Sequence, residues 1–239
     1  MTSVEAKTIK GNIAYCNGNN RKSLLDAIGP DVVKYLDDFV HVPVDDTTGL
    51  PTAWTNTLVQ AGAGNTTVGS ADYSGGALAI VTDNADNDGA NCQLKGESFK
   101  LSSGNVVYFG AKVKLSETIQ SDLFLGLSIT DTDILGGITD GIGFKKVDAS
   151  ATLTFILTKN STTTTINLAP MMDGVETVLE FYFDGTTLEV FVDGVSVATP
   201  VVTNLVDDEE LRPSVHFLTG EAAIKTATID WIRCIQFGR

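Results

Sequence analysis

The chain has few of the residues on which metal centres and disulfide frameworks depend. Its 239 residues include only three cysteines, Cys16, Cys92 and Cys234, and two histidines. The cysteines are odd in number and widely spaced, so they match neither a disulfide framework nor a CxxC metal pattern, and a zinc site would have few ligands to draw on. We therefore expect structural thiols, no metal and no cofactor.

Basic residues are also scarce. Sixteen lysines and arginines stand against 30 aspartates and glutamates, which gives a formal net charge of −14. Nucleic acids and anionic membranes are bound through basic surfaces, so neither is expected as a partner. The sequence has no apolar run near the roughly 20 residues that span a bilayer. The opening MTSVEAKTIKGNIAYCNGNN lacks the continuous apolar core of a secretion signal, so no signal peptide is expected.

What the chain does have is a repeated alternation of apolar and polar residues. In LEFYFDGTTLEVFVDGVSVATP, residues 179–200, this period of two gives each strand one face to bury. The dipeptide Asp193-Gly194 suits a two-residue type I′ turn, in which both residues need a positive φ. That turn would place Val190 opposite Val197. The stretch therefore predicts two consecutive β-hairpins.

From His41 onward, similar short runs are split by clusters of Gly, Asn, Asp and Thr, a spacing typical of a sandwich or jelly roll. The segment NNRKSLLDAIGPDVVKYLDDF fits two short helices instead, with Ser23 capping the first and Pro30 beginning the second. We therefore predict an all-β sandwich at 40–239 with a short helical N-terminal appendage, an arm and two helices, at 1–39.

The apolar side chains of this helical pair need a cover, because helices this short are not stable alone. They would pack on the sandwich of the same chain or on another chain, and the sequence favours neither. The candidate residues for contact with another chain or with sister subunits are Leu24, Leu25, Ile28, Val32, Val33 and Leu36.

Catalytic groups are hard to find in the sequence. A glycosidase needs two carboxylates across a cleft, and β-sandwich glucanases usually carry them as ExDxxE along one strand. This sequence has no such string. His41 and His216 are the only candidate bases, and neither lies beside a GxSxG-type nucleophile motif. We therefore predict no enzymatic activity and no catalytic residue.

Two aromatic residues are candidates for glycan contact. Trp54 and Tyr73 adjoin loop-like segments, although packing is the commoner use of a tryptophan. The acidic segment DNADNDGAN, residues 83–91, opens like a calcium loop of the EF-hand type. Lys95 stands where the closing glutamate should be, so a solvated turn is favoured over a weak calcium site.

Several longer runs are similar to those of a known family. They are SDLFLGLSITDTDILGGITDGIGFKK, FYFDGTTLEVFVDGVSVATP and LVDDEELRPSVHFLTGEAAIKTATIDWIR, together with KYLDDF nearer the N-terminus. Over residues 20–237 the chain thereby resembles tailed-bacteriophage virion proteins that carry a concanavalin A-like (laminin-G-like) jelly roll.

The resemblance implies a non-enzymatic structural protein that decorates or cements a phage capsid. Its partners would be the major capsid protein and sister subunits in a homo-oligomer, and a trimer would suit the local threefold axes of a capsid. The protein would lie on the virion surface after assembly in the host cytoplasm. The alternative is a virion-borne carbohydrate-binding module that contacts host or mucus glycans. Concanavalin A-like folds serve lectins, glucanases and adhesion modules alike, so the fold alone does not decide.

Overall fold

The protein is almost entirely β-structure. The computed structural model describes residues 3–62 and 64–238, which form 18 strands and one four-residue helix, α1 (Ile134–Gly137). Met1 and Thr2, at the start of the predicted N-terminal arm, lie outside the described residues. The predicted all-β jelly-roll sandwich is therefore confirmed.

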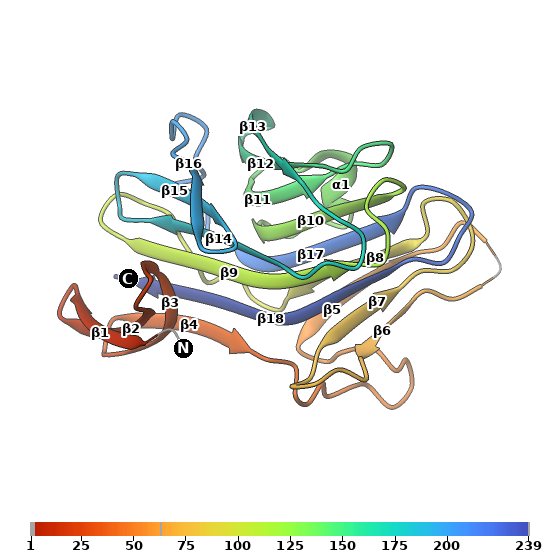
Figure 1. Cartoon of the computed structure of the whole chain (residues 1–239), viewed down its shortest axis with the longest axis horizontal. Helices are drawn as coiled ribbons and strands as arrows, with labels where there is room; N and C mark the ends of the chain where they lie inside the picture. Colours follow the sequence, from red (N-terminus) through yellow and green to blue (C-terminus); the bar gives the residue numbers. More distant parts are fainter. Residues whose placement is uncertain (1–2, 63, 239) are drawn as a thin grey trace.

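Two antiparallel sheets face each other across one core (Figure 1). The seven-stranded sheet has the order β13 (Thr162–Pro170), β12 (Thr152–Lys159), β11 (Gly141–Lys146), β10 (Ser121–Ser128), β17 (Arg212–Thr219), β8 (Gly89–Leu94) and β5 (Trp54–Val59). The eight-stranded sheet has the order β16 (Val195–Ala198), β15 (Leu188–Val192), β14 (Thr177–Phe183), β9 (Val106–Leu115), β18 (Thr226–Phe237), β7 (Leu78–Val81) and β6 (Thr67–Ser70), and β4 (Val32–Asp37) also pairs with β18.

The predicted N-terminal helices are wrong. Their segment forms β4 and β3 (Asn20–Ile28), which joins β1 (Val4–Ile9) and β2 (Asn12–Asn17) in a separate three-stranded sheet. A bulge in β3 interrupts its register with β2 at Leu25, so two leucines follow each other and the alternation is lost. Residues 32–37 pair as strand β4 with β18, which satisfies their backbone groups. A short isolated helix of the same residues would not be stable.

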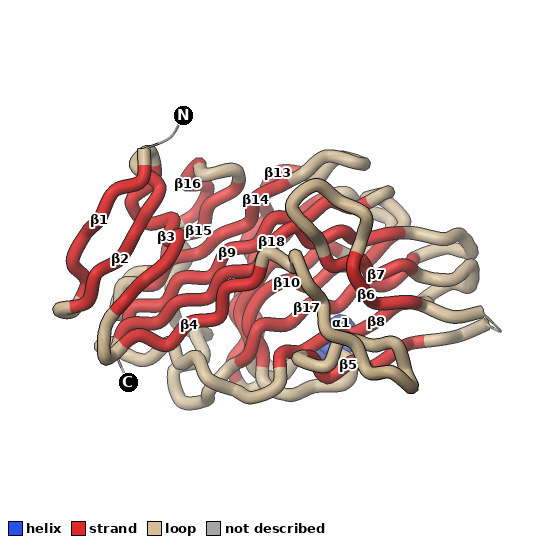
Figure 2. The backbone as a smooth tube through the Cα atoms, turned by 90° about the horizontal axis from the view of Figure 1, so that it is seen from below, coloured by secondary structure: helices blue, strands red, loops and turns tan. Residues whose placement is uncertain are grey.

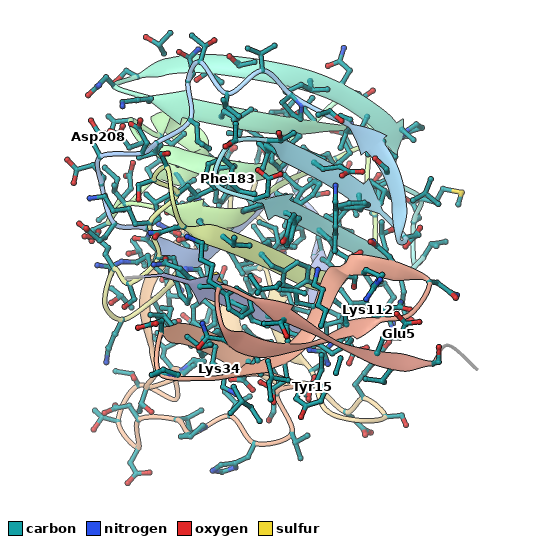
Figure 3. All side chains as sticks on the ribbon, turned by 90° about the vertical axis from the view of Figure 1, so that its left-hand side faces the viewer. Glu5, Tyr15, Lys34, Lys112, Phe183 and Asp208 are labelled. Carbon is teal, nitrogen blue, oxygen red and sulfur yellow. The ribbon has the colours of Figure 1, made fainter. Side chains whose placement is uncertain are left out.

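The three-stranded sheet forms a third layer on the outer face of the eight-stranded sheet. Leu24 and Ala27 pack there against Tyr182, Phe191 and Phe237 in a buried cluster separate from the main core. In Figure 3, Glu5 and Tyr15 lie on these strands at one side of the molecule, and Asp208 lies away from them. The domain boundary at residue 39 stays a prediction, although β4 pairs with the sandwich.

The predicted turn at Asp193-Gly194 is confirmed, because both residues have positive φ, 51° and 74°. The pairing beyond it differs from the prediction. A register shift follows Phe191, so Val190 lies opposite Ala198 and not opposite Val197. A bulge of this kind bends an edge strand, and its extra residue cannot be read from the alternation.

Both termini lie at the same end of the molecule (Figures 1 and 2). Figure 2 shows β4 alongside β18, with the loop after β4 leading toward the other end. Within the described residues, no helix is long and apolar enough to cross a membrane.

Candidate functional site

The outer face of the seven-stranded sheet, the face turned away from the core, carries a loop of residues 129–140. We call it the α1 loop, because it contains α1, which lies beside β10 and β11 in Figure 1. Ile129 N–H donates to the Asp140 carbonyl at 3.2 Å and closes the base of the loop. The loop therefore starts and ends on the sheet that it covers.

Apolar side chains hold the middle of the α1 loop on the sheet. Ile134 and Ile138 pack with Phe124 of β10 and Ile156 of β12 in a small cluster outside the main core. Ile134 and Phe124 are each fully buried. Beside Phe124, Gly126 lies so close to the backbone of Ile142 and Gly143 in β11 that a Cβ atom would not fit there.

Polar side chains of three strands hold the first half of the loop. We call them the polar strip, and its members are Asn91 and Gln93 of β8, Ser128 of β10, and Ser214 and His216 of β17. All five are buried. Strand alternation puts them on the outer face, because the residues between them point into the core.

Backbone groups of the α1 loop pair with the strip. The Gln93 amide donates to the Ile129 carbonyl at 2.8 Å and accepts from Asp131 N–H at 2.9 Å. The Asn91 amide donates to the Asp131 carbonyl at 2.7 Å. Leu135 N–H donates to His216 Nδ1 at 3.2 Å. These bonds satisfy loop groups that would otherwise lie buried without partners.

His216 is neutral in this environment. Burial lowers the pKa of His216 to about 4, against the opposing effect of Asp133 and with a further lowering by Lys145. Because Nδ1 accepts a hydrogen bond, the proton of the neutral ring is on Nε2. Nε2 is buried and has no hydrogen-bond partner, and the same holds for Oδ1 of Asn91.

A first hollow of about 470 Å³ lies on one side of the α1 loop. It is lined by loop residues and by strands β11 to β13: Gly137, Ile138, Lys145, Val147, Thr154, Ile156, Ser161, Thr163 and Thr165. Hydroxyls, apolar side chains and one cation thus share this hollow. Lys145 Nζ donates to the Leu135 carbonyl at 3.1 Å, which ties the charge to the loop.

A second hollow, also of about 470 Å³, lies on the other side of the loop and is acidic. It is lined by Val59, Asn87, Asp122, Asp133, Leu135, Gly136, Asp148 and Leu218. Burial raises the pKa of Asp122, and the charge of Asp148 adds to the rise. Asp148 N–H donates to Asp122 Oδ1 at 2.9 Å, so these two acidic residues lie side by side.

The two predicted glycan-contact residues are not part of this face. Trp54 is only 3% exposed and packs in the main core, edge-on to Tyr35 with ring centroids 5.9 Å apart, so its assignment as a glycan contact is corrected. Tyr73 follows β6, in the other sheet, and Lys114 Nζ lies over its ring at 5.0 Å. The two aromatic side chains do not form a common surface.

The six predicted capsid or subunit contacts are mostly used inside the chain. Leu24 is fully buried in the third layer, and Val32, Val33 and Leu36 pack against the two cores as half-buried strand residues. Leu25 is half-buried and Ile28 is 57% exposed. The sequence left two partners possible for these apolar side chains, the sandwich of the same chain or another chain. The structure shows most of them packed within the same chain.

The acidic segment at residues 83–91 leads into β8. Within it, Asp88 is fully buried and its Oδ1 accepts from Ala61 N–H, while Asp86 is exposed. Among the described residues, no group of three or more His, Cys, Asp or Glu side chains could hold a metal ion. The three cysteines are free and buried.

Comparison with solved structures identifies the fold. A Bacteroides ovatus mixed linkage glucan GH16 protein in complex with a product matches with a TM-score of 0.60, 15% identity and coverage of 83% of this chain and 98% of that chain. An endo-1,3-β-glucanase from Streptomyces sioyaensis gives 0.59 at 11% identity, covering 90% and 100%. The carbohydrate recognition domain of Emp46p, potassium-bound, gives 0.56 at 12% identity, covering 83% and 94%.

At such identities these likenesses show the fold alone, which is the concanavalin A-like jelly roll of glycoside hydrolases and carbohydrate recognition domains. No protein-family model matches the chain, and no curated protein matches it by sequence. None of the similar structures reported above is a phage or capsid protein, so the virion assignment stays a prediction.

The comparisons correct the prediction that the protein is not an enzyme. Glucanases of the GH16 type share the fold of the chain over more than four-fifths of its length. The absence of an ExDxxE string is therefore no ground for excluding catalysis, because carboxylates can meet across strands. Asp122 of β10 and Asp148 of the turn after β11 both line the second hollow.

Sequence reasoning missed the polar strip and both hollows. One signal was present: in GANCQL and PSVHFL, polar residues alternate with core residues, so Asn91, Gln93 and His216 share a face. The sequence did not show that the α1 loop buries this face, because the contacts between loop and strip join residues 36 to 81 positions apart.

Proposed function

We propose that the protein binds glycans on the outer face of the seven-stranded sheet, at the two hollows beside the α1 loop. The observation that carries the proposal is the mixed lining of these hollows, where hydroxyls, carboxylates, an amide and a lysine alternate with apolar side chains. Sugars offer hydroxyls that both donate and accept, together with apolar C–H faces, and such a surface matches both.

The solved structures with this fold support the choice of ligand. Their names include a mixed linkage glucan protein, an endo-1,3-β-glucanase and a carbohydrate recognition domain. Neutral β-glucans also agree with the charge of the chain, because a net charge of −14 repels polyanionic sugars.

The test is isothermal titration calorimetry with oligosaccharides of mixed-linkage glucan and of 1,3-β-glucan. Thr165→Val removes one hydroxyl of the first hollow, and Asp122→Asn removes the charge of one carboxylate in the second. Each should weaken binding about three- to tenfold, the value of one hydrogen bond. Thr186→Val, on an exposed turn of the other sheet, is the matched control and should change nothing. Equal affinities for all four proteins would refute the assignment of the face.

Hydrolysis is a second candidate function, favoured by the two acidic residues Asp122 and Asp148, which line the same hollow. The raised pKa of Asp122 would favour its protonated form, as a general acid requires. Incubation with the same glucans and measurement of new reducing ends tests this. Release that is lost in Asp122→Asn would establish it, whereas binding without release would leave a binding module.

A place on a phage capsid is our proposal for the setting of this glycan-binding face, and it rests on the sequence resemblance. The major capsid protein and sister subunits would then be the partners. Quantitative mass spectrometry of purified virions would test it, since a lattice decoration should occur at a simple fraction of the capsid-protein copy number. Absence from the particles would contradict it.

A further inference from the structure

Two atoms under the α1 loop lack the partners that buried polar atoms need. His216 Nε2 and Asn91 Oδ1 are buried without a hydrogen bond, and their residues are 0% and 1% exposed. His216 and Asn91 are register partners on β17 and β8, with side chains on the same face of the sheet. Directly opposite side chains start about 5 Å apart. The two atoms therefore occur in one small region.

Their chemistry is complementary to a hydroxyl group. His216 Nε2 carries a hydrogen to donate, because Nδ1 already accepts from Leu135 N–H. Asn91 Oδ1 can only accept, because Nδ2 already donates to the Asp131 carbonyl. A hydroxyl, whether of a sugar or of water, can accept from one and donate to the other. Buried polar atoms without partners are rare and destabilising in proteins, so this pair favours a group that can bond to both.

We propose that the polar strip is a binding site for one neutral sugar residue of the glycan chain, whose hydroxyl bonds to His216 Nε2 and Asn91 Oδ1 after the α1 loop is displaced. This site rests on the proposed function and extends it. It adds a contact on β17 and β8 beside the second hollow, at a place that the α1 loop now covers.

The hydrogen bonds that attach the α1 loop to the polar strip are of a kind that a sugar can replace. Three strip residues bond to loop backbone groups, and each of these bonds can be replaced by a sugar hydroxyl, so the strip loses no partner. Both hollows are lined by loop residues, Leu135 and Gly136 on one side and Gly137 and Ile138 on the other. Lifting the loop would therefore join two hollows of about 470 Å³ each into one groove.

Hydrogen–deuterium exchange of the intact protein tests the displacement. Saturating mixed-linkage glucan oligosaccharide should speed exchange in peptides that cover residues 129–140, because Asp131 N–H and Leu135 N–H lose their acceptors. A ligand that only fills the hollows would slow exchange there. Unchanged or slower exchange at saturation would overturn the proposal and leave the proposed function standing.

A substitution in the α1 loop and one in the polar strip distinguish the roles of these two parts. Ile134→Ala loosens the apolar anchor of the loop and should tighten glucan binding about tenfold, because the open state becomes more populated. Ile80→Ala, an equally buried change in β7 of the other sheet, is the matched control and should leave affinity unchanged. Tighter glucan binding by both variants, or by neither, would contradict the proposal that the α1 loop covers the sugar site.

Asn91→Ala should weaken binding about tenfold, even though it also removes a bond that holds the loop. If the strip served only to fasten the loop, this variant would bind more tightly, as Ile134→Ala does. Tighter binding by Asn91→Ala would therefore overturn the sugar contact. No binding by the wild type or by Ile134→Ala would overturn both this site and the proposed function.

Discussion

His216 is the residue whose chemistry depends most on its burial. An ordinary histidine has a pKa near 6.5, whereas burial under the α1 loop lowers the pKa of His216 to about 4. Between these values the unfolded chain holds a proton that the folded chain does not. The free energy of unfolding therefore rises as the pH increases from about 4 to about 6.5, and this contribution is constant above that range.

This difference predicts a pH-dependent stability change that a substitution should remove. His216 should contribute a loss of about 3 kcal/mol between pH 7 and pH 4. His216→Gln keeps an acceptor for Leu135 N–H but does not titrate. Urea unfolding of both proteins at pH 7, 5.5 and 4 measures the effect. Carboxylates contribute equally to both, so parallel curves for the two proteins would contradict the prediction.

The groups around His216 also explain why its imidazole ring is neutral. The Leu135 N–H points at Nδ1, so a protonated ring would lose this acceptor and place two donors against each other. Asp133 favours the charged ring and Lys145 opposes it, and burial outweighs both. A protonated His216 would therefore weaken one fastening of the loop as well as the fold.

At the scale of elements, strand β3 packs the third layer against the sandwich. Leu24→Ala should lower the free energy of unfolding by about 2–5 kcal/mol, because Leu24 is fully buried between the third layer and the sandwich. Ile28→Ala in the same strand is the control, and at 57% exposure it should cost less than about 1 kcal/mol. Denaturant unfolding measures both. Similar costs would show that the third layer is not firmly packed in solution.

Strand periodicity predicted most of the fold beyond residue 53, and it failed where a strand is irregular. The helical interpretation of residues 20–37 arose because Leu24, Leu25 and Ile28 fit helical spacing as well as a bulged strand does. The same reason explains the wrong pair at Val190, which follows a register shift. Bulges are decided by pairing between strands, so local sequence does not reveal them.

The candidate site was less predictable than the fold. Strand alternation places His216 and Asn91 on one face, but only the three-dimensional arrangement puts the α1 loop over them. Trp54 shows the converse error, because packing is the commoner use of a tryptophan and Trp54 lies in the core. A resemblance in sequence could not correct either point, since it carried no site residues.

At the scale of the whole molecule, the third layer is an integral cover and not a detachable arm. A protein that lacks residues 1–28 would expose the aromatic side chains of Tyr182, Phe191 and Phe237 to water. We expect it to self-associate and to melt at a lower temperature than the intact chain, because a contiguous apolar surface drives association. Analytical ultracentrifugation and calorimetry measure both. A monomer that melts like the intact protein would contradict the integral role.

The pairing of β4 with β18 has a consequence for how the chain acquires its structure. Residues 32–37 find their partners only at residues 232–237, and the layer formed by residues 4–28 rests on side chains of that same late strand. During synthesis the first sheet must therefore wait, unpacked, until nearly 200 further residues have left the ribosome. Contacts this distant in sequence slow folding, so completion of the sandwich, and not formation of its first hairpins, should set the pace.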